Sequence, residues 1–68
     1  MKSYFTFGQS HVHSVGGTTF DKDCVVEIEA ESAEKAREKM FYFFGAKWSF
    51  QYDKKPDMSF FTRGIIKL

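Results

Sequence analysis

The stretch GQSHVHSVGGTTF, residues 8–20, holds both histidines of the chain and a glycine pair, and it decides the fold. Gly16 and Gly17 suit a two-residue hairpin turn, because both central positions of the favoured turn type need a positive φ. A turn at residues 16 and 17 pairs residues whose numbers add up to 33, so Phe7 would face Val26 and Phe5 would face Ile28. Both pairs are apolar and share a face, which predicts one long hairpin from about residue 3 to residue 30.

The segments on either side of the turn alternate as half-buried strands do. KSYFTFGQ (residues 2–9) places two phenylalanines on one face, and CVVEIEA (residues 24–30) alternates apolar side chains with Glu27 and Glu29. The following segment, ESAEKAREKMFYFFG (residues 31–45), predicts a helix. Ser32 suits the N-cap, Gly45 suits the C-terminal end, and apolar residues recur at spacings of three and four, namely Ala33, Ala36, Met40 and Phe43 or Phe44.

The last third of the chain predicts two more strands. KWSFQYD (residues 47–53) places Trp48, Phe50 and Tyr52 on one face, KKPDM (residues 54–58) favours a turn, and SFFTRGIIKL (residues 59–68) is a strand broken near Gly64. We therefore expect residues 1–68 to form a single α+β domain. Its order is β-β-α-β-β, with a mainly antiparallel sheet and one helix packed on one face. The expected core is Phe5, Phe7, Val26, Ile28, Ala36, Met40, Trp48 and Phe50.

Length and composition restrict the class of protein. A domain of 68 residues buries a small core, and nine Phe, three Tyr and one Trp supply much of its apolar area. The single cysteine, Cys24, excludes an internal disulfide and suits a reducing cytoplasm. The chain has neither an apolar run long enough for a membrane span nor a signal-peptide core, so we expect a cytoplasmic protein with no membrane contact.

Charge gives little support for nucleic acid as a partner. The net charge is +1, although residues 21–40 carry four basic and seven acidic groups and residues 41–68 carry five basic and two acidic groups. This polarity suits a charged partner of any class.

The histidines first suggest a metal site, because His11 and His13 would point to the same side of a strand. A zinc site needs three or four protein ligands, the only soft addition is Cys24, and Lys22 would face His11. We favour a polar hairpin tip that is wet or touches a partner, and we expect no metal or other cofactor.

A catalytic site has still less support. Cys24 with His11 resembles a nucleophile and base in residue type alone, and the glycines match neither a phosphate-binding loop nor a dinucleotide fingerprint. We expect no enzymatic activity.

The aromatic strand has two interpretations. Trp48, Phe50 and Tyr52, with Lys47, Lys54 and Lys55 nearby, could stack bases, or they could pack beneath the small residues of the helix. We favour packing. The aromatic supply still exceeds one small core, so some of Tyr4, Phe41, Tyr42 and Phe61 should stay exposed and mark an interface.

Several segments resemble short proteins of bacteriophages and prophages that have no assigned activity. The likeness covers nearly the whole chain, and it rests on YFTFGQ (residues 4–9) with the two histidines, VVEIEAESAEKAREKMF (25–41), FFG (43–45), KWSFQY (47–52) and FFTRG (60–64). The resemblance implies a viral accessory protein in a bacterial cytoplasm, and it transfers no site residues.

We therefore expect a protein that binds and inhibits a host bacterial protein, for example a component of a CRISPR or other defence system. Sequestration of a small nucleotide-like ligand, or binding of single-stranded nucleic acid, is the alternative. A homodimer is also expected, because the chain is small, has no covalent cross-link and has spare aromatic area. The candidate partner-binding residues are His11, His13, Tyr42, Lys54, Lys55 and Arg63.

Overall fold

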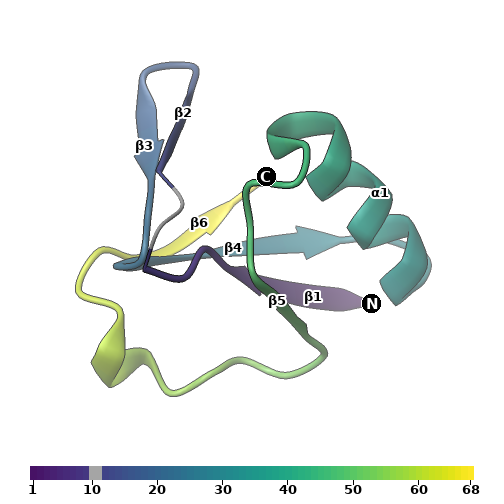
Figure 1. Ribbon diagram of the computed structural model, residues 1–68. Helices are drawn as coiled ribbons and strands as arrows, with labels where there is room; N and C mark the ends of the chain where they lie inside the picture. Colours follow the sequence, from purple (N-terminus) through teal and green to yellow (C-terminus); the bar gives the residue numbers. More distant parts are fainter. Residues whose placement is uncertain (10–11) are drawn as a thin grey trace.

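The glycine pair forms the predicted turn. The computed structural model describes residues 1–9 and 12–68. Gly16 and Gly17 have φ of 58° and 84°, and they join β2 (His13–Val15) to β3 (Thr18–Phe20). The pairs His13–Phe20, Ser14–Thr19 and Val15–Thr18 confirm the expected register next to the turn. This short hairpin stands apart from the main sheet, on the left in Figure 1.

The base of the hairpin differs from the prediction. β1 (Lys2–Thr6) pairs with β4 (Cys24–Glu29) so that Phe5 faces Val26 and Ser3 faces Ile28, two residues away from the expected register. The reason is unequal chain length: six residues separate Thr6 from His13, whereas four separate Phe20 from Val25. A shift of two keeps every side chain on its face, so the faces were predicted correctly although the partners were wrong.

The main sheet is mixed. Its strand order is β5-β1-β4-β6, with β5 at Phe50–Tyr52 and β6 at Gly64–Lys67. β1 is antiparallel to both of its neighbours, and β6 runs parallel to β4. Helix α1 (Ala33–Phe44) packs on one face of this sheet, which confirms the α+β fold with one helix on one face (Figure 1).

The helix begins and ends at its predicted caps. The Ser32 hydroxyl accepts a hydrogen bond of 3.2 Å from the backbone N–H of Lys35, and Gly45, at φ 61°, donates its N–H to the carbonyl of Phe41. Ala36, Met40 and Phe44 are buried, which is the spacing of one helical face. The helix therefore needs the sheet to cover that stripe.

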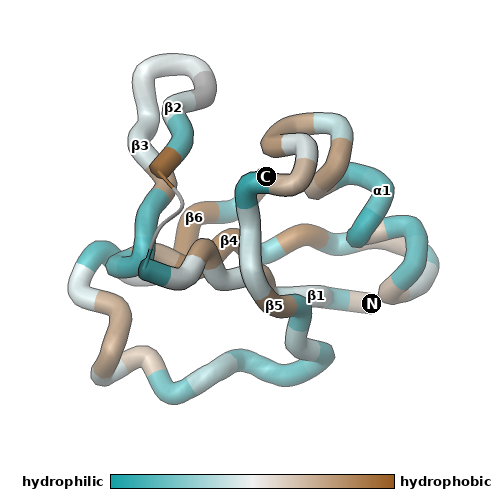
Figure 2. Tube along the Cα trace, viewed as in Figure 1, coloured by the Kyte–Doolittle hydropathy of each residue, from teal (hydrophilic) through white to brown (hydrophobic). Residues whose placement is uncertain are grey.

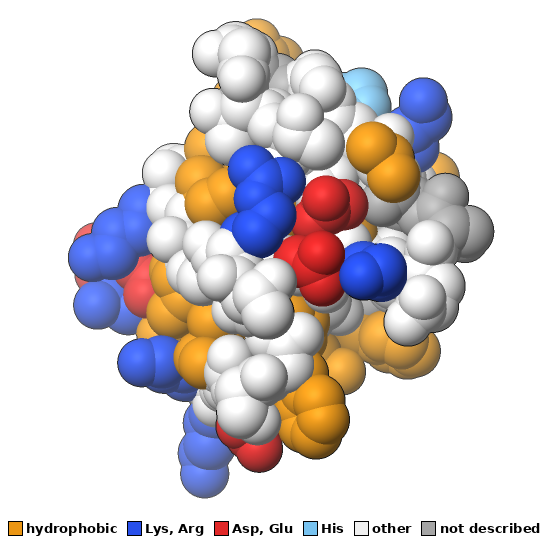
Figure 3. Space-filling view, turned by 90° about the vertical axis from the view of Figure 1, so that its left-hand side faces the viewer, with side chains coloured by type: hydrophobic (Ala, Val, Ile, Leu, Met, Phe, Trp, Pro, Cys, Tyr) orange, Lys and Arg blue, Asp and Glu red, His pale blue; other side chains and the backbone are white. Residues whose placement is uncertain are grey.

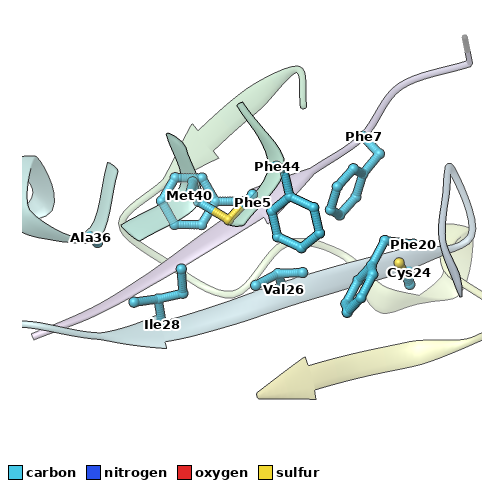
Figure 4. Packing of buried hydrophobic residues seen from close by; sticks show 9 residues of the cluster. All are labelled: Phe5, Phe7, Phe20, Cys24, Val26, Ile28, Ala36, Met40 and Phe44. Atoms are coloured by element: carbon cyan, nitrogen blue, oxygen red, sulfur yellow. The ribbon is translucent and has the colours of Figure 1, made fainter. Parts of the chain in front are cut away.

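The core lies between this stripe and the strands, and Figure 4 shows the phenylalanine rings of Phe7, Phe20 and Phe44 meeting there. The ring of Phe44 makes edge contacts with those of Phe7 and Phe20 at centroid distances of 5.1 and 4.9 Å. Of the eight expected core residues, seven belong to this core or pack against it: Phe5, Phe7, Val26, Ile28, Ala36, Met40 and Trp48. The eighth, Phe50, is 63% exposed, so that prediction was wrong.

The chain returns beneath the sheet. Residues 53–63, which include the short 3₁₀ helix η1 (Met58–Phe60), run on the side opposite α1 in Figure 1. Val25 is fully buried although it lies outside the helix-side cluster, and by alternation with Val26 it faces the side of the sheet on which this returning segment runs (Figure 1). Figure 2 shows the segment as hydrophilic just after β5 and hydrophobic at η1.

Candidate partner-binding surface

β5 turns two aromatic rings away from the helix. Gln51 lies opposite Phe5 on the helix side, where its amide nitrogen donates a 2.8 Å hydrogen bond to the carbonyl of Ala33. Its amide oxygen accepts a 2.9 Å hydrogen bond from Nε of Arg37. Because side chains alternate along a strand, Phe50 and Tyr52 face the other way, and they are 63% and 42% exposed.

A local irregularity explains why Trp48 and Phe50 lie on different sides. The Trp48 ring packs edge-on against Phe5 at 5.2 Å, on the helix side. Thr6 is the register partner of Phe50, and its carbonyl also accepts a 2.8 Å hydrogen bond from the N–H of Ser49. Two consecutive residues thus face one, as in a β-bulge, and the alternation changes phase between Trp48 and Gln51. The predicted common face of Trp48, Phe50 and Tyr52 is therefore wrong.

The returning segment places two further rings beside β5. Phe60 is 74% exposed and Phe61 is half-buried. Together with Tyr52 they line a pocket of about 340 Å³ between the second face of the sheet and η1. The centroids of the Phe50 and Tyr52 rings are 6.3 Å apart, and Tyr52 also lines the pocket with Phe60 and Phe61, so Tyr52 lies between the two groups of exposed rings. We call Phe50, Tyr52, Phe60 and Phe61 the sheet-side aromatic surface.

η1 is held in place by its own cap. The carboxylate of Asp57 accepts a 3.0 Å hydrogen bond from the backbone N–H of Ser59, and this bond lowers the pKa of Asp57. The cap fixes the turn that presents Phe60.

Polar groups of both signs border the aromatic surface. The wall of the same pocket includes Lys22 and Asp23, whose charged groups are 3.1 Å apart. Lys54 and Lys55 follow β5 and are exposed. Figure 3 shows the side of the molecule that carries the β2–β3 hairpin and η1, where acidic side chains lie between basic ones near the centre and hydrophobic side chains lie around and below them. The pocket wall therefore carries charges of both signs beside its rings.

A buried carboxylate lies deeper on the same side of the sheet. Glu27 is 9% exposed, faces Tyr4 across the β1–β4 pair, and lies 4.0 Å from the ammonium group of Lys67. Burial raises the pKa of Tyr4, and the neighbouring Glu27 carboxylate raises it further.

The candidate residues from the sequence lie at separate places. His11 is outside the described residues. His13 is half-buried, and its ring lies 5.5 Å from that of Phe44, beside the core. Tyr42 is 84% exposed on the outer side of α1, away from the sheet-side aromatic surface. Lys54 and Lys55 follow Tyr52 in the chain after Asp53 and are exposed. Of the rings on the sheet-side aromatic surface, the sequence assigned Phe50 to the core and named Phe61 among the rings that should stay exposed.

Arg63 has contacts of its own. Its guanidinium donates a 2.7 Å hydrogen bond to the carbonyl of Thr19 and lies 3.5 Å from the carboxylate of Asp21. Its backbone N–H donates to the carbonyl of Asp23. Arg63 therefore connects the start of β6 to the β2–β3 hairpin.

Within residues 1–9 and 12–68, no three His, Cys, Asp or Glu side chains come together as metal ligands would. Cys24 is fully buried, and burial raises the pKa of its thiol. The sulfur also accepts a hydrogen bond from the N–H of Asp21 at 3.4 Å. A buried, protonated thiol is a poor nucleophile and a poor metal ligand.

Comparisons with protein-family models, with curated proteins and with solved structures find no match to this chain. Among the helices in the described part of the chain, none has the length and apolar character needed to cross a bilayer.

The exposed phenylalanines could not be recognised from the sequence alone. Phe50 alternates with Trp48, and strand periodicity assigns both to one face. The available signal was Gln51: its amide needs partners when buried, and in the structure it donates to the carbonyl of Ala33 at the start of the helix.

Proposed function

We propose that this protein works by binding a protein partner through the sheet-side aromatic surface. The observation that carries the proposal is the exposure of Phe50 and Phe60, 63% and 74%, on either side of Tyr52, whose ring neighbours that of Phe50 and lines a pocket with Phe60. Aromatic rings that stay in contact with water do not stabilise the fold of a small domain. Exposed apolar patches of this kind serve as interfaces. Aromatic residues are also enriched at the centres of protein interfaces.

The resemblance to short phage and prophage proteins supplies the setting of this proposal. In that setting the partner is a host bacterial protein, such as a component of a CRISPR or other defence system, and binding inhibits it. Lys54 and Lys55 are exposed just after β5, and they supply positive charge for acidic groups on the partner.

The test compares matched exposed aromatics. A tagged double variant, Phe50→Ala with Phe60→Ala, should lose a stoichiometric partner that the unmodified chain captures from a bacterial host lysate. Tyr42→Ala removes a still more exposed ring, 84%, from the helix side and should keep that partner. Capture that is equal for both variants, or lost for Tyr42→Ala alone, would place the binding surface elsewhere.

The pocket beside Tyr52 supports a second candidate function. Its volume of about 340 Å³, its three rings and the Lys22–Asp23 pair suit a planar, nucleotide-like ligand. A protein that sequesters such a ligand should release an ultraviolet-absorbing molecule when it is denatured.

Single-stranded nucleic acid would use the same rings for stacking. In that case, binding of a labelled oligonucleotide should weaken steeply as salt rises. Absence of both signals, together with loss of the captured protein in the double variant, would favour the protein partner.

A further inference from the structure

The outer edge of β5 is open. β5 is the terminal strand of the order β5-β1-β4-β6, so in the described part of the chain it pairs with β1 on one side alone. An unpaired strand edge is a template for another strand, and proteins usually protect it. The three residues of β5 carry no proline and no lysine that would block such pairing.

A groove of about 520 Å³ follows this edge. One wall is the first part of α1, with Ala33 and Arg37, and the other is the chain from Trp48 to Asp53. The Gln51 side chain bridges the two walls through its hydrogen bonds to Ala33 and Arg37, and these contacts fix the position of α1 relative to β5. An extended segment can therefore enter beside β5.

We propose that the occupant is a second copy of this chain, whose β5 pairs antiparallel with the first across a two-fold axis at Gln51. In an antiparallel pair, directly opposed side chains lie on the same side of the sheet. Pairing Gln51 with Gln51 of the second copy keeps the faces matched and overlaps all three residues of each strand. In a register displaced by one residue, side chains from the helix side of one copy would lie opposite side chains from the aromatic side of the other.

This register places complementary groups opposite each other on both faces. On the second face, Phe50 of each copy lies opposite Tyr52 of the other, which adds two aromatic cross-strand pairs. Just beyond the paired strands, Asp53 of one copy lies opposite Ser49 of the other, next to the position where Gln51 holds Arg37. Both Arg37 and Asp53 line the groove, and neither belongs to an ion pair among the described residues. The two-fold symmetry makes this charge contact twice.

Three-residue strands overlap over a small area, so the dimer should be weak and reversible. The inference does not depend on the proposed function, because it rests on the open edge of β5 and on the groove beside that edge, although Phe50 and Tyr52 contribute to both. It adds to that function, because pairing would join two sheet-side aromatic surfaces into one.

The test measures the molecular mass of the protein in solution and reverses the charges of Arg37 and Asp53. Sedimentation of the full chain over a hundredfold concentration range should show a concentration-dependent dimer. Arg37→Asp or Asp53→Arg alone should each raise the dissociation constant by about tenfold, because each places like charges opposite each other. The double variant, Arg37→Asp with Asp53→Arg, should restore association to within about threefold of the unmodified chain.

Two controls separate this contact from general charge effects. Lys35→Asp and Glu38→Arg make the same charge changes on the exposed side of α1, and they should leave the dissociation constant unchanged. Trp48, the single tryptophan, lines the groove, so its emission should shift to shorter wavelength as the dimer forms.

A mass of one chain at every concentration would overturn the proposal. A dimer that the single reversals leave intact, or that the double variant fails to restore, would overturn the β5 pairing. Loss of the captured partner in the Phe50 and Phe60 variant bears on the proposed function and leaves the mass of the unmodified chain unaffected, so the two failures are distinguishable.

Discussion

Phe5 and Phe50 show how much the side of a strand matters for a single residue. Both are phenylalanines in strands, and they are close neighbours through the β1–β5 pairing. Phe5 is fully buried and contacts Trp48, whereas Phe50 is 63% exposed on the opposite face.

We predict that Phe5→Ala lowers the free energy of unfolding by about 3–5 kcal/mol, because it removes a buried ring and leaves a cavity. Phe50→Ala should lower it by less than about 1 kcal/mol, since the ring is mostly in water. Denaturant titrations of the two variants measure both values. Equal losses would mean that β5 presents its other face to the helix.

Cys24 gives a pH prediction with a definite sign. Burial raises the pKa of its thiol above the ordinary value of 9.0 in the native state. Above that pH the unfolded chain releases the thiol proton before the native chain does, so this contribution to stability is complete below pH 9 and declines as pH rises through the native pKa. The free energy of unfolding should therefore fall more steeply as pH rises above about 9 in the unmodified chain than in Cys24→Ala. If the free energies of unfolding of the two proteins changed with pH in parallel, the thiol would not have the raised pKa. The contribution of Tyr4, whose pKa is also raised, is present in both proteins and cancels in the comparison.

At the scale of elements, the bend that follows β1 depends on Gly8. Its φ is +69°, and a Cβ at this position would overlap the hydroxyl of Ser49. Gly8→Ala should cost about 1–3 kcal/mol, from the backbone strain and the contact together. Adding Ser49→Ala should restore the part of the free energy of unfolding that was lost through the contact with the Ser49 hydroxyl. A double-mutant cycle measures this part. Gly16→Ala, at φ +58° with open space around it, is the control for backbone strain alone.

The β2–β3 hairpin is held to the rest of the fold partly by Arg63. Its guanidinium bonds the carbonyl of Thr19 and lies near Asp21. Arg63→Ala should speed amide hydrogen exchange in residues 13–20 by about three- to tenfold while leaving the main sheet protected. Lys67→Ala, which removes a weaker 4.0 Å pair with Glu27, is the control. Uniform acceleration over the whole chain would show that Arg63 stabilises the fold globally.

At the scale of the whole molecule, one apolar cluster joins residues from β1, β3, β4 and α1. Because no element has a separate core, we predict a single cooperative unfolding transition. Far-ultraviolet circular dichroism and Trp48 fluorescence should give the same midpoint in denaturant. Separate midpoints would indicate that β5 and its neighbours unfold independently of the helix.

The sequence by itself determined the features that depend on neighbouring residues. The turn at Gly16 and Gly17 needs two positive φ values, the helix begins at Ser32 and ends at Gly45 through its own caps, and the parity of β1 and β4 assigns their apolar faces. Each of these is decided within a few residues along the chain, so periodicity and turn chemistry were sufficient to predict them.

Tertiary structure alone decided the rest. The register of β1 with β4 depends on the number of residues between β1 and β2 compared with the number between β3 and β4. The side that β5 presents depends on Gln51 reaching Ala33 and Arg37, and on the bulge opposite Thr6. Alternation along β5 determines that its two sets of side chains face opposite sides of the sheet. Which of the two sets is buried depends on contacts with residues far away in the sequence. For this protein that choice places Phe50 and Tyr52 in water, and it creates the aromatic surface on which the proposed function rests.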